Sequence, residues 1–422
     1  MNSLGNLPLL FPYNIPHLPL LFPYNIPHEM EDEEKPTSHE IEIINDATEQ
    51  SHIDLIVPNQ QSKLPLLARF HAGYFRISLS LCSQALLWKT RSEPTMDSHA
   101  SHKELFALPS TALLLLWSIS LFILLSLSIL YLLRCIFYFN MVKSEFLHHV
   151  GVNYLFAPWI SWLLLLQSSP FINPIATYYP VLWWVIAIPI VALDVKIYGQ
   201  WFTKGKRFLW TVANPTSQLS VIGNLVGARA AAQMGWKESA VFMFSLGMVH
   251  YLVLYVTLYQ RLLGGDRLPV MLRPVFFLFI ATPSTASLAW SSISGSFGVG
   301  SKMLFFLSLF LFASLVSRPA LFKRSMQRFH VTWWAYSFPL SVLALASIEY
   351  AQEVKGGIAN LLMLVLLALS VLVALGLLVF TTLNSGHLLP DDDPIIYPPP
   401  HSVVNTVEVA NAIKPQPTDV GS

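Results

Sequence analysis

The residues of this chain that could do chemistry are isolated charges inside apolar stretches, not a catalytic cluster. Arg76 lies within the apolar stretch 65–88, and Arg229 lies within the stretch 212–234. An arginine at the centre of a membrane-spanning helix costs about 2.5–3.5 kcal/mol on insertion scales. We therefore expect Arg76 to face a cavity or a partner, or to extend to the membrane surface. The sequence leaves open whether such a charge would attract an anion or obstruct its path.

Prolines interrupt several apolar stretches that otherwise have the composition of helices. They are Pro158 in "NYLFAPWISW", Pro215 in "NPTSQLSVIGNLVGARAAA", Pro283 in "RPVFFLFIATPSTASLAW" and Pro339 in "WWAYSFPLSVLALAS". A proline inside a helix removes a backbone donor and costs about 3 kcal/mol. At membrane depth such a break is tolerated where the backbone is buried in protein or lines a water-filled cavity. The prolines therefore predict kinked helices that border a cavity.

Motifs of known enzyme classes do not occur in the sequence. It contains no phosphate-binding glycine loop, no nucleophile elbow and no metalloprotease helix motif. The two cysteines, Cys82 and Cys135, lie inside apolar stretches and favour buried thiols over a disulfide or a metal site. No run of basic residues suggests nucleic acid. We expect no enzyme activity, no metal, no cofactor and no nucleic-acid partner.

Composition indicates a membrane protein. Of 422 residues, 54% are hydrophobic and 12% charged, against roughly 25% charged in soluble domains. Ten apolar windows follow one another with short connections: roughly 65–88, 110–138, 149–169, 179–199, 212–234, 239–262, 272–292, 302–317, 330–350 and 359–384. This pattern predicts an all-α integral membrane protein with a ten-helix domain at 63–385.

Disordered tails are predicted on both sides of this domain, at residues 1–62 and 386–422, because both are polar and rich in proline. The first tail contains a tandem repeat, "LPLLFPYNIPH", at 7–17 and 18–28. Each copy is too short to span a bilayer, and we interpret the repeat as a duplication without function.

The ten predicted helices are of two kinds. The odd windows contain small and polar residues, and four of them contain the prolines named above, whereas most even windows are uniformly apolar. Small and polar residues favour close contact between helices, so the odd helices are predicted to be inner and the even ones to form an outer ring facing lipid.

Lys and Arg are concentrated in the connections between windows 2 and 3, 4 and 5, 6 and 7, and 8 and 9. The positive-inside rule then places both tails in the cytoplasm. Three of these residues, Lys143, Arg207 and Arg318, would lie at the cytoplasmic mouth of a path between the inner helices. With no carboxylate in the middle of an inner helix, they suit an anion; the positive-inside rule alone could also explain them.

The inner-helix strings "GYFRISLSLCSQALLW", "VNYLFAPW", "VANPTSQLSVIGNLVGA", "PVFFLFIATPSTASLAW" and "WWAYSFPL" resemble the plant slow-type (S-type) anion channels of guard cells. More distantly they resemble bacterial tellurite-resistance and dicarboxylate transporters. The resemblance covers about residues 64–390. It implies ten helices, a pore within five inner helices of each subunit, and a trimer.

The resemblance also implies weakly voltage-dependent efflux of chloride and nitrate across the plasma membrane, by a homotrimer or a heteromer of related subunits. It implies that Phe338 projects into the pore and closes it. The pore-helix kinks carry over as Pro158, Pro215, Pro283 and Pro339, and the cytoplasmic basic positions as Lys143, Arg207 and Arg318.

Departures from the family pattern leave alternatives open. The family has Gly where this chain has Arg76, and relatives often have Lys where it has Glu349. The first tail lacks the Ser/Thr-rich basic region that kinases use in better-known members, so regulatory kinases are left open as partners. The chain could instead be a modulatory subunit, or a secondary transporter exporting dicarboxylate or sulfite-like anions.

Overall fold

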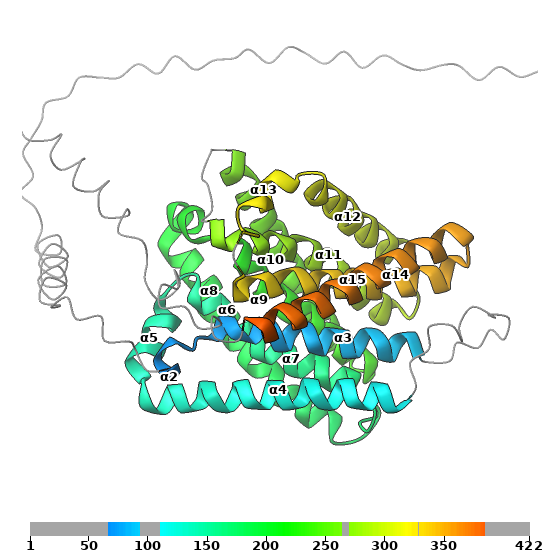
Figure 1. Cartoon of the computed structure of the whole chain (residues 1–422), viewed down its shortest axis with the longest axis horizontal. Coiled ribbons are helices and arrows are strands. Elements are labelled where there is room, and N and C mark those ends of the chain that lie inside the picture. Colours follow the sequence, from blue (N-terminus) through cyan, green and yellow to red (C-terminus); the bar gives the residue numbers. More distant parts are fainter. Residues whose placement is uncertain (1–65, 93–109, 264–269, 328, 385–422) are drawn as a thin grey trace, which may run out of the picture. The chain divides into compact units, whose positions relative to one another are not determined.

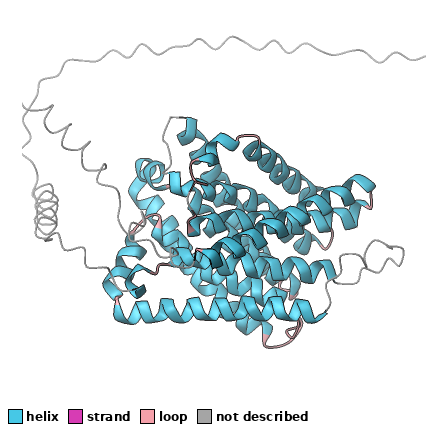
Figure 2. Ribbon diagram, viewed as in Figure 1, coloured by secondary structure: helices cyan, strands magenta, loops and turns pink. Residues whose placement is uncertain are grey.

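A computed structural model describes residues 66–92, 110–263, 270–327 and 329–384. Every regular element in these ranges is a helix (Figures 1 and 2). The predicted tails at 1–62 and 386–422, with the tandem repeat, lie outside the described residues. The all-α prediction is confirmed.

Five helical units have a common design, in which a short helical segment leads into a longer α-helix. They are η1 (Ala72–Phe75) with α3 (Arg76–Ser92), α6 (Gly151–Tyr154) with α7 (Phe156–Ser168), η3 (Pro215–Ser217) with α9 (Gln218–Gln233), η4 (Val270–Phe277) with α11 (Leu278–Ser294), and η5 (Val331–Tyr336) with α14 (Ser337–Val354). Four of the short segments are 3₁₀-helices, which occur in short pieces at helix ends and at functional hinges. We call these the five inner units; they correspond to the odd predicted windows.

The inner units form a closed ring. Helix α3 packs against α7, α7 against α9, α9 against α11, α11 against α14, and α14 returns to α3. Their side chains are almost fully enclosed by protein: 94% of the apolar window in Val331–Val354 and 78% of that in Arg273–Ser294 is buried.

Outer helices surround this ring. They are α4 (Ser110–Phe137), α8 (Tyr179–Val212), α10 (Lys237–Leu263), α12 (Val299–Val316) and α15 (Gly357–Leu383). Helix α4 packs on α3, α8 on α7 and α9, α10 on α9, α12 on α11, and α15 on α14. Only 11–39% of their apolar windows is buried, which agrees with the predicted division into inner and outer helices.

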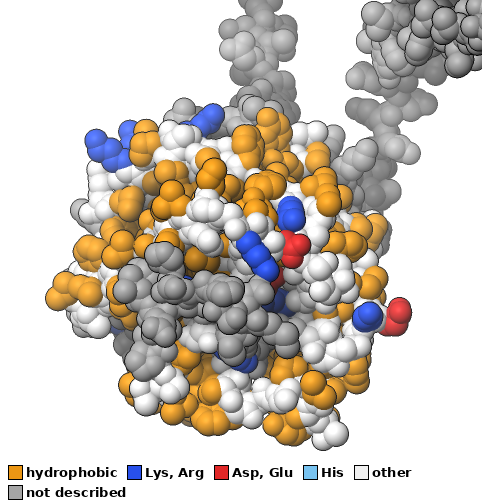
Figure 3. Space-filling view, turned by 90° about the vertical axis from the view of Figure 1, so that its right-hand side faces the viewer, with side chains coloured by type: hydrophobic (Ala, Val, Ile, Leu, Met, Phe, Trp, Pro, Cys, Tyr) orange, Lys and Arg blue, Asp and Glu red, His pale blue; other side chains and the backbone are white. Residues whose placement is uncertain are grey.

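Exposed hydrophobic side chains cover the outer helices, and the end-on view shows few charged side chains among them (Figure 3). An apolar surface of this extent requires lipid or protein around it. Within the described ranges, seven helices are long and apolar enough to cross a membrane, and the pair α5 (Phe139–Leu147) and Gly151–Ser168, bent by 102°, raises the number to eight. Helices α3 and α9 are shorter, with 17 and 16 residues, and more polar. The count of ten stays a prediction.

Polar contacts between helices fix the position of the inner units. The Ser78 and Ser161 hydroxyls lie 3.2 Å apart between α3 and α7. Gln84 of α3 donates to the hydroxyls of Ser341 on α14 (2.9 Å) and Ser370 on α15 (2.8 Å). Because lipid offers such groups no partner, these hydrogen bonds favour one arrangement of the helices.

Candidate functional site: the central cavity

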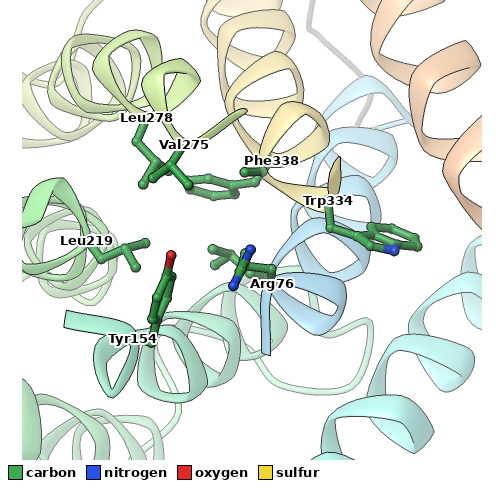
Figure 4. Close-up of a pocket in the computed structure, with 9 residues that line it drawn as sticks. Arg76, Tyr154, Leu219, Val275, Leu278, Trp334 and Phe338 are labelled. Atoms are coloured by element: carbon green, nitrogen blue, oxygen red, sulfur yellow. The ribbon is translucent and has the colours of Figure 1, made fainter. Parts of the chain in front are cut away.

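A narrow cavity lies where the five inner units meet. It has a volume of about 10 Å³ and is lined by Arg76, Leu79, Tyr154, Leu219, Val275, Leu278, Trp334, Ala335 and Phe338 (Figure 4). Every inner unit contributes at least one of these side chains. The volume is sufficient for about one water molecule, so the centre of the ring is closed in this structure.

The residues around the cavity lie where the inner units change their helical geometry. Arg76 and Leu278 are the first residues of α3 and α11, Leu219 and Phe338 are the second residues of α9 and α14, and Tyr154 is the last residue of α6. Irregular backbone at membrane depth is tolerated where it lines a cavity or is buried in protein. The five changes of geometry therefore meet at one level of the ring, around the same space.

Phe338 forms one wall of the cavity. Its side chain is 1% exposed, and its ring extends toward Val275 (Figure 4). The neighbouring wall residues Leu278 and Ala335 are apolar as well. This is the position at which an aromatic ring could close a path, as the resemblance implies, and the gating role itself stays a prediction.

Arg76 lines the cavity near Phe338 with its guanidinium facing the ring of Tyr154 (Figure 4). Its Cζ lies 4.6 Å from the centroid of that ring, and its Nε donates to the carbonyl oxygen of Gly73 at 2.8 Å. The side chain is 4% exposed, and its terminal nitrogens Nη1 and Nη2 are buried without a hydrogen-bond partner. No carboxylate in the described part of the chain forms an ion pair with it.

Gly73 makes room for this arginine. A Cβ atom at position 73 would lie 2.7 Å from Nη2 of Arg76 and 2.5 Å from Cε1 of His71. Sequence reasoning did not single out Gly73 or Tyr154, although Gly73 precedes Arg76 by three residues in "HAGYFR" and Tyr154 precedes Pro158 by four in "NYLFAP".

Three of the four prolines lie in the first turn of a helical segment. Pro215 is the first residue of η3, while Pro158 and Pro339 are the third residues of α7 and α14. A missing N–H is least costly in a first turn. Pro283 alone among the four lies in a helix interior, in α11. Their role as pore-helix kinks stays a prediction.

Two of the three predicted basic residues, Lys143 and Arg318, are not among the residues that line the cavity. Lys143 is exposed on α5, and Arg318 is exposed directly before α13 (Pro319–Lys323). Arg207 belongs to α8, and its side chain is outside the described part of the structure. The structure does not bring Lys143 or Arg318 together with Phe338; their role at the mouth stays a prediction.

An ion pair between Arg229 and Glu349 connects two inner helices at some distance from the cavity. Nη2 of Arg229 on α9 is 3.0 Å from Oε1 of Glu349 on α14, and the two side chains are 7% and 18% exposed. Helix α11 stands between α9 and α14 in the ring, so the ion pair joins two inner helices that are not neighbours. Glu349 follows Phe338 by 11 residues, which is about three turns and about 16 Å along the same face of α14. Sequence reasoning identified both residues and did not pair them.

Comparison with known proteins decides the family. A family model described as "Voltage-dependent anion channel" matches residues 69–382. Two Arabidopsis thaliana proteins, S-type anion channels SLAH1 and SLAH4, are 60% and 58% identical over 326 and 329 residues; the matches cover 77% and 78% of this chain and 84% and 87% of theirs. The chain belongs to the S-type anion channel family. The guard cell S-type anion channel SLAC1 of the same plant is 42% identical over 344 residues, 80% of this chain and 60% of its own length.

This S-type family member is accordingly a multi-pass membrane protein, and the resemblance inferred from the inner-helix strings is confirmed. The relatives are named as channels, so the expectation that the chain is not an enzyme is also confirmed. The family model matches residues 69–382, which include all five inner units and the residues that line the cavity between them.

Proposed function

We propose that this chain is an anion channel subunit that passes chloride and nitrate through the centre of the five-unit ring, out of the cell across the plasma membrane. The observation that carries the proposal is the central cavity, because each of the five inner units contributes to its wall. A path for ions needs such a shared lining, whereas a purely structural bundle would have no reason to place five helix irregularities around one space.

Phe338 closes this path. A chloride or nitrate ion with part of its hydration shell does not fit a space of about 10 Å³. The part of the wall formed by Phe338, Val275 and Leu278 is apolar, and apolar constrictions exclude water and ions together. Removing the ring at position 338 would widen the cavity beside Val275 and Leu278, which line it together with Phe338.

The assembly and orientation follow the family. The subunit works as a homotrimer or in a heteromer with related channel subunits, with both termini in the cytoplasm. Lys143, Arg207 and Arg318 then lie on the cytoplasmic side, where their charges would raise the local concentration of anions at the entrance.

A modulatory subunit is the second candidate function. One observation favours it: the ion pair between Arg229 and Glu349 joins α9 and α14 farther along the inner helices. This pair would restrict conduction by this chain alone, while leaving it able to assemble with a conducting relative.

Voltage-clamp recording of the wild type and Phe338→Ala, alone and with a conducting relative, tests the proposal. We expect anion current to increase in Phe338→Ala. Phe305→Ala is the matched control, because Phe305 is equally buried, on α12, outside the cavity. The proposal fails if neither protein conducts an anion and neither alters the current of the relative. Saturable exchange of labelled malate would instead establish a secondary transporter.

A further inference from the structure

The guanidinium of Arg76 is charged, buried and incompletely bonded. Its Nη1 and Nη2 have no hydrogen-bond partner although the side chain is only 4% exposed. The great majority of buried polar groups in proteins are hydrogen-bonded, and a buried charge without a counter-charge is among the most costly arrangements a fold can contain. The two free nitrogens belong to a residue that lines the central cavity (Figure 4).

The surroundings of Arg76 hold it in place without using these nitrogens. Nε donates to the Gly73 carbonyl oxygen at 2.8 Å, and Cζ lies over the ring of Tyr154, 4.6 Å from its centroid. Neither contact is a hydrogen bond of Nη1 or Nη2. Both nitrogens therefore remain available to an acceptor in the cavity.

We infer that Arg76 binds one small monovalent inorganic anion through Nη1 and Nη2 when the ring of Phe338 moves aside, because the closed cavity of about 10 Å³ has room for about one water molecule only. The inference rests on the proposed function in that it places the site on the anion path. A guanidinium donates two parallel hydrogen bonds to a planar oxyanion, which favours nitrate, and a chloride ion can accept from both nitrogens. A water molecule could accept the same hydrogen bonds, but it would leave the charge uncompensated.

The other walls of the cavity set the size and charge of the ligand. Tyr154 contributes a hydroxyl group, whereas Leu79, Leu219, Val275 and Phe338 offer no polar atoms from their side chains. A divalent, strongly hydrated ion such as sulfate would lose its water here without enough donors to replace it. The site therefore prefers a weakly hydrated monovalent ion.

The test uses the purified full-length chain in detergent, with nitrate replacing gluconate at constant ionic strength. A ligand that binds the folded state raises the melting temperature with the logarithm of its concentration above Kd. We expect this rise in the wild type with nitrate, a smaller rise with sulfate, and its loss in Arg76→Met. Arg76→Lys keeps the positive charge but lacks the two parallel donors of the guanidinium. Nitrate should therefore raise its melting temperature less than that of the wild type.

Arg134, another buried arginine, provides a control. Arg134 on α4 pairs with Glu145 at 2.8 Å, and the two side chains are 3% and 5% exposed. The double variant Arg134→Met, Glu145→Gln removes a buried cation together with its counter-charge, and it should keep the nitrate response. If Arg76→Met cannot be purified, Gly73→Ala crowds both the His71 ring and the guanidinium with the charge of Arg76 retained, and its nitrate response should be weakened.

The inference is overturned if Arg76→Met or Gly73→Ala responds to nitrate like the wild type, or if nitrate and sulfate act equally on the wild type. Anion flux into liposomes made from the same preparations separates the two proposals. Flux through the wild type with an Arg76-independent nitrate response overturns the anion site alone. An Arg76-dependent nitrate response with no flux supports the site and counts against the proposed channel function.

Discussion

The ion pair between Arg229 and Glu349 makes a prediction that can be worked out in free energy. The two side chains are 7% and 18% exposed and their charged atoms are 3.0 Å apart, so solvent screens the pair only in part. Removing one partner of a buried pair costs about 3–5 kcal/mol because the other charge stays buried without compensation. Allowing for the partial exposure of Glu349, we expect Arg229→Met to lower the free energy of unfolding by about 2–3 kcal/mol.

The double variant Arg229→Met, Glu349→Met should recover most of this loss. Replacing both charges by apolar side chains of similar length is often neutral, so the double variant is expected within about 1 kcal/mol of the wild type. The coupling energy between Arg229 and Glu349 from the double-mutant cycle is then about 2 kcal/mol or more. The assay is reversible unfolding of the purified chain in mild detergent, with each variant measured under the same conditions.

Arg134 and Glu145 provide the internal comparison, because their 2.8 Å contact is more fully buried, at 3% and 5% exposure. Their coupling energy should be at least as large as that of Arg229 and Glu349. A coupling below about 0.5 kcal/mol for Arg229 and Glu349, in the range of exposed ion pairs, would show that water screens the pair. It would refute the view that the pair holds α9 and α14 together across the ring.

Three substitutions test the packing of the ring. Gln84→Leu removes the hydrogen bonds from α3 to serines of α14 and α15, and should lower the free energy of unfolding by about 1 kcal/mol; no change would mean these bonds do not stabilise the ring. Gly151→Ala would place Cβ 2.6 Å from the backbone oxygen of Glu145, so we expect a loss of about 1–3 kcal/mol and a lower yield of folded protein. Gly227→Ala would meet a methionine side chain at 2.6 Å instead. Because that side chain is flexible, the loss should be smaller than for Gly151→Ala, and the reverse order would contradict the reasoning.

The inner and outer helices were predictable because lipid imposes a strong compositional rule. Uniformly apolar windows such as 359–384 can face lipid, whereas windows with serines, glycines and an arginine, such as 65–88, cannot. The alternation of these two kinds of window therefore indicated the ring before any contact was known. The 3₁₀ segments were not predicted, because hydropathy does not distinguish a 3₁₀ turn from the first turn of an α-helix.

The individual contacts of the site could not be predicted from one sequence. Proline suggested kinks in the middle of helices, but Pro158 and Pro339 lie in first turns, since helix starts depend on tertiary packing as well as on local sequence. Arg229 and Glu349 are 120 residues apart, and nothing local indicates that α9 and α14 approach each other past α11. Tyr154 was missed for the same reason: its role depends on the position of α3.

On the proposed anion path, Phe338 and Arg76 would act on an anion in opposite directions, with comparable magnitudes. Removing water from an ion costs several kcal/mol even after relaxation of the protein, so the apolar wall around Phe338 would oppose the entry of an anion. A guanidinium about 4 Å from the ion returns about 4 kcal/mol at an effective dielectric constant of about 20. Arg76 can therefore offset much of the desolvation cost, but it cannot remove the steric obstruction by the ring. The current gained in Phe338→Ala should then depend on Arg76, falling when Arg76→Met is added, and an unchanged current in the double variant would show that the arginine does not act on the permeating anion.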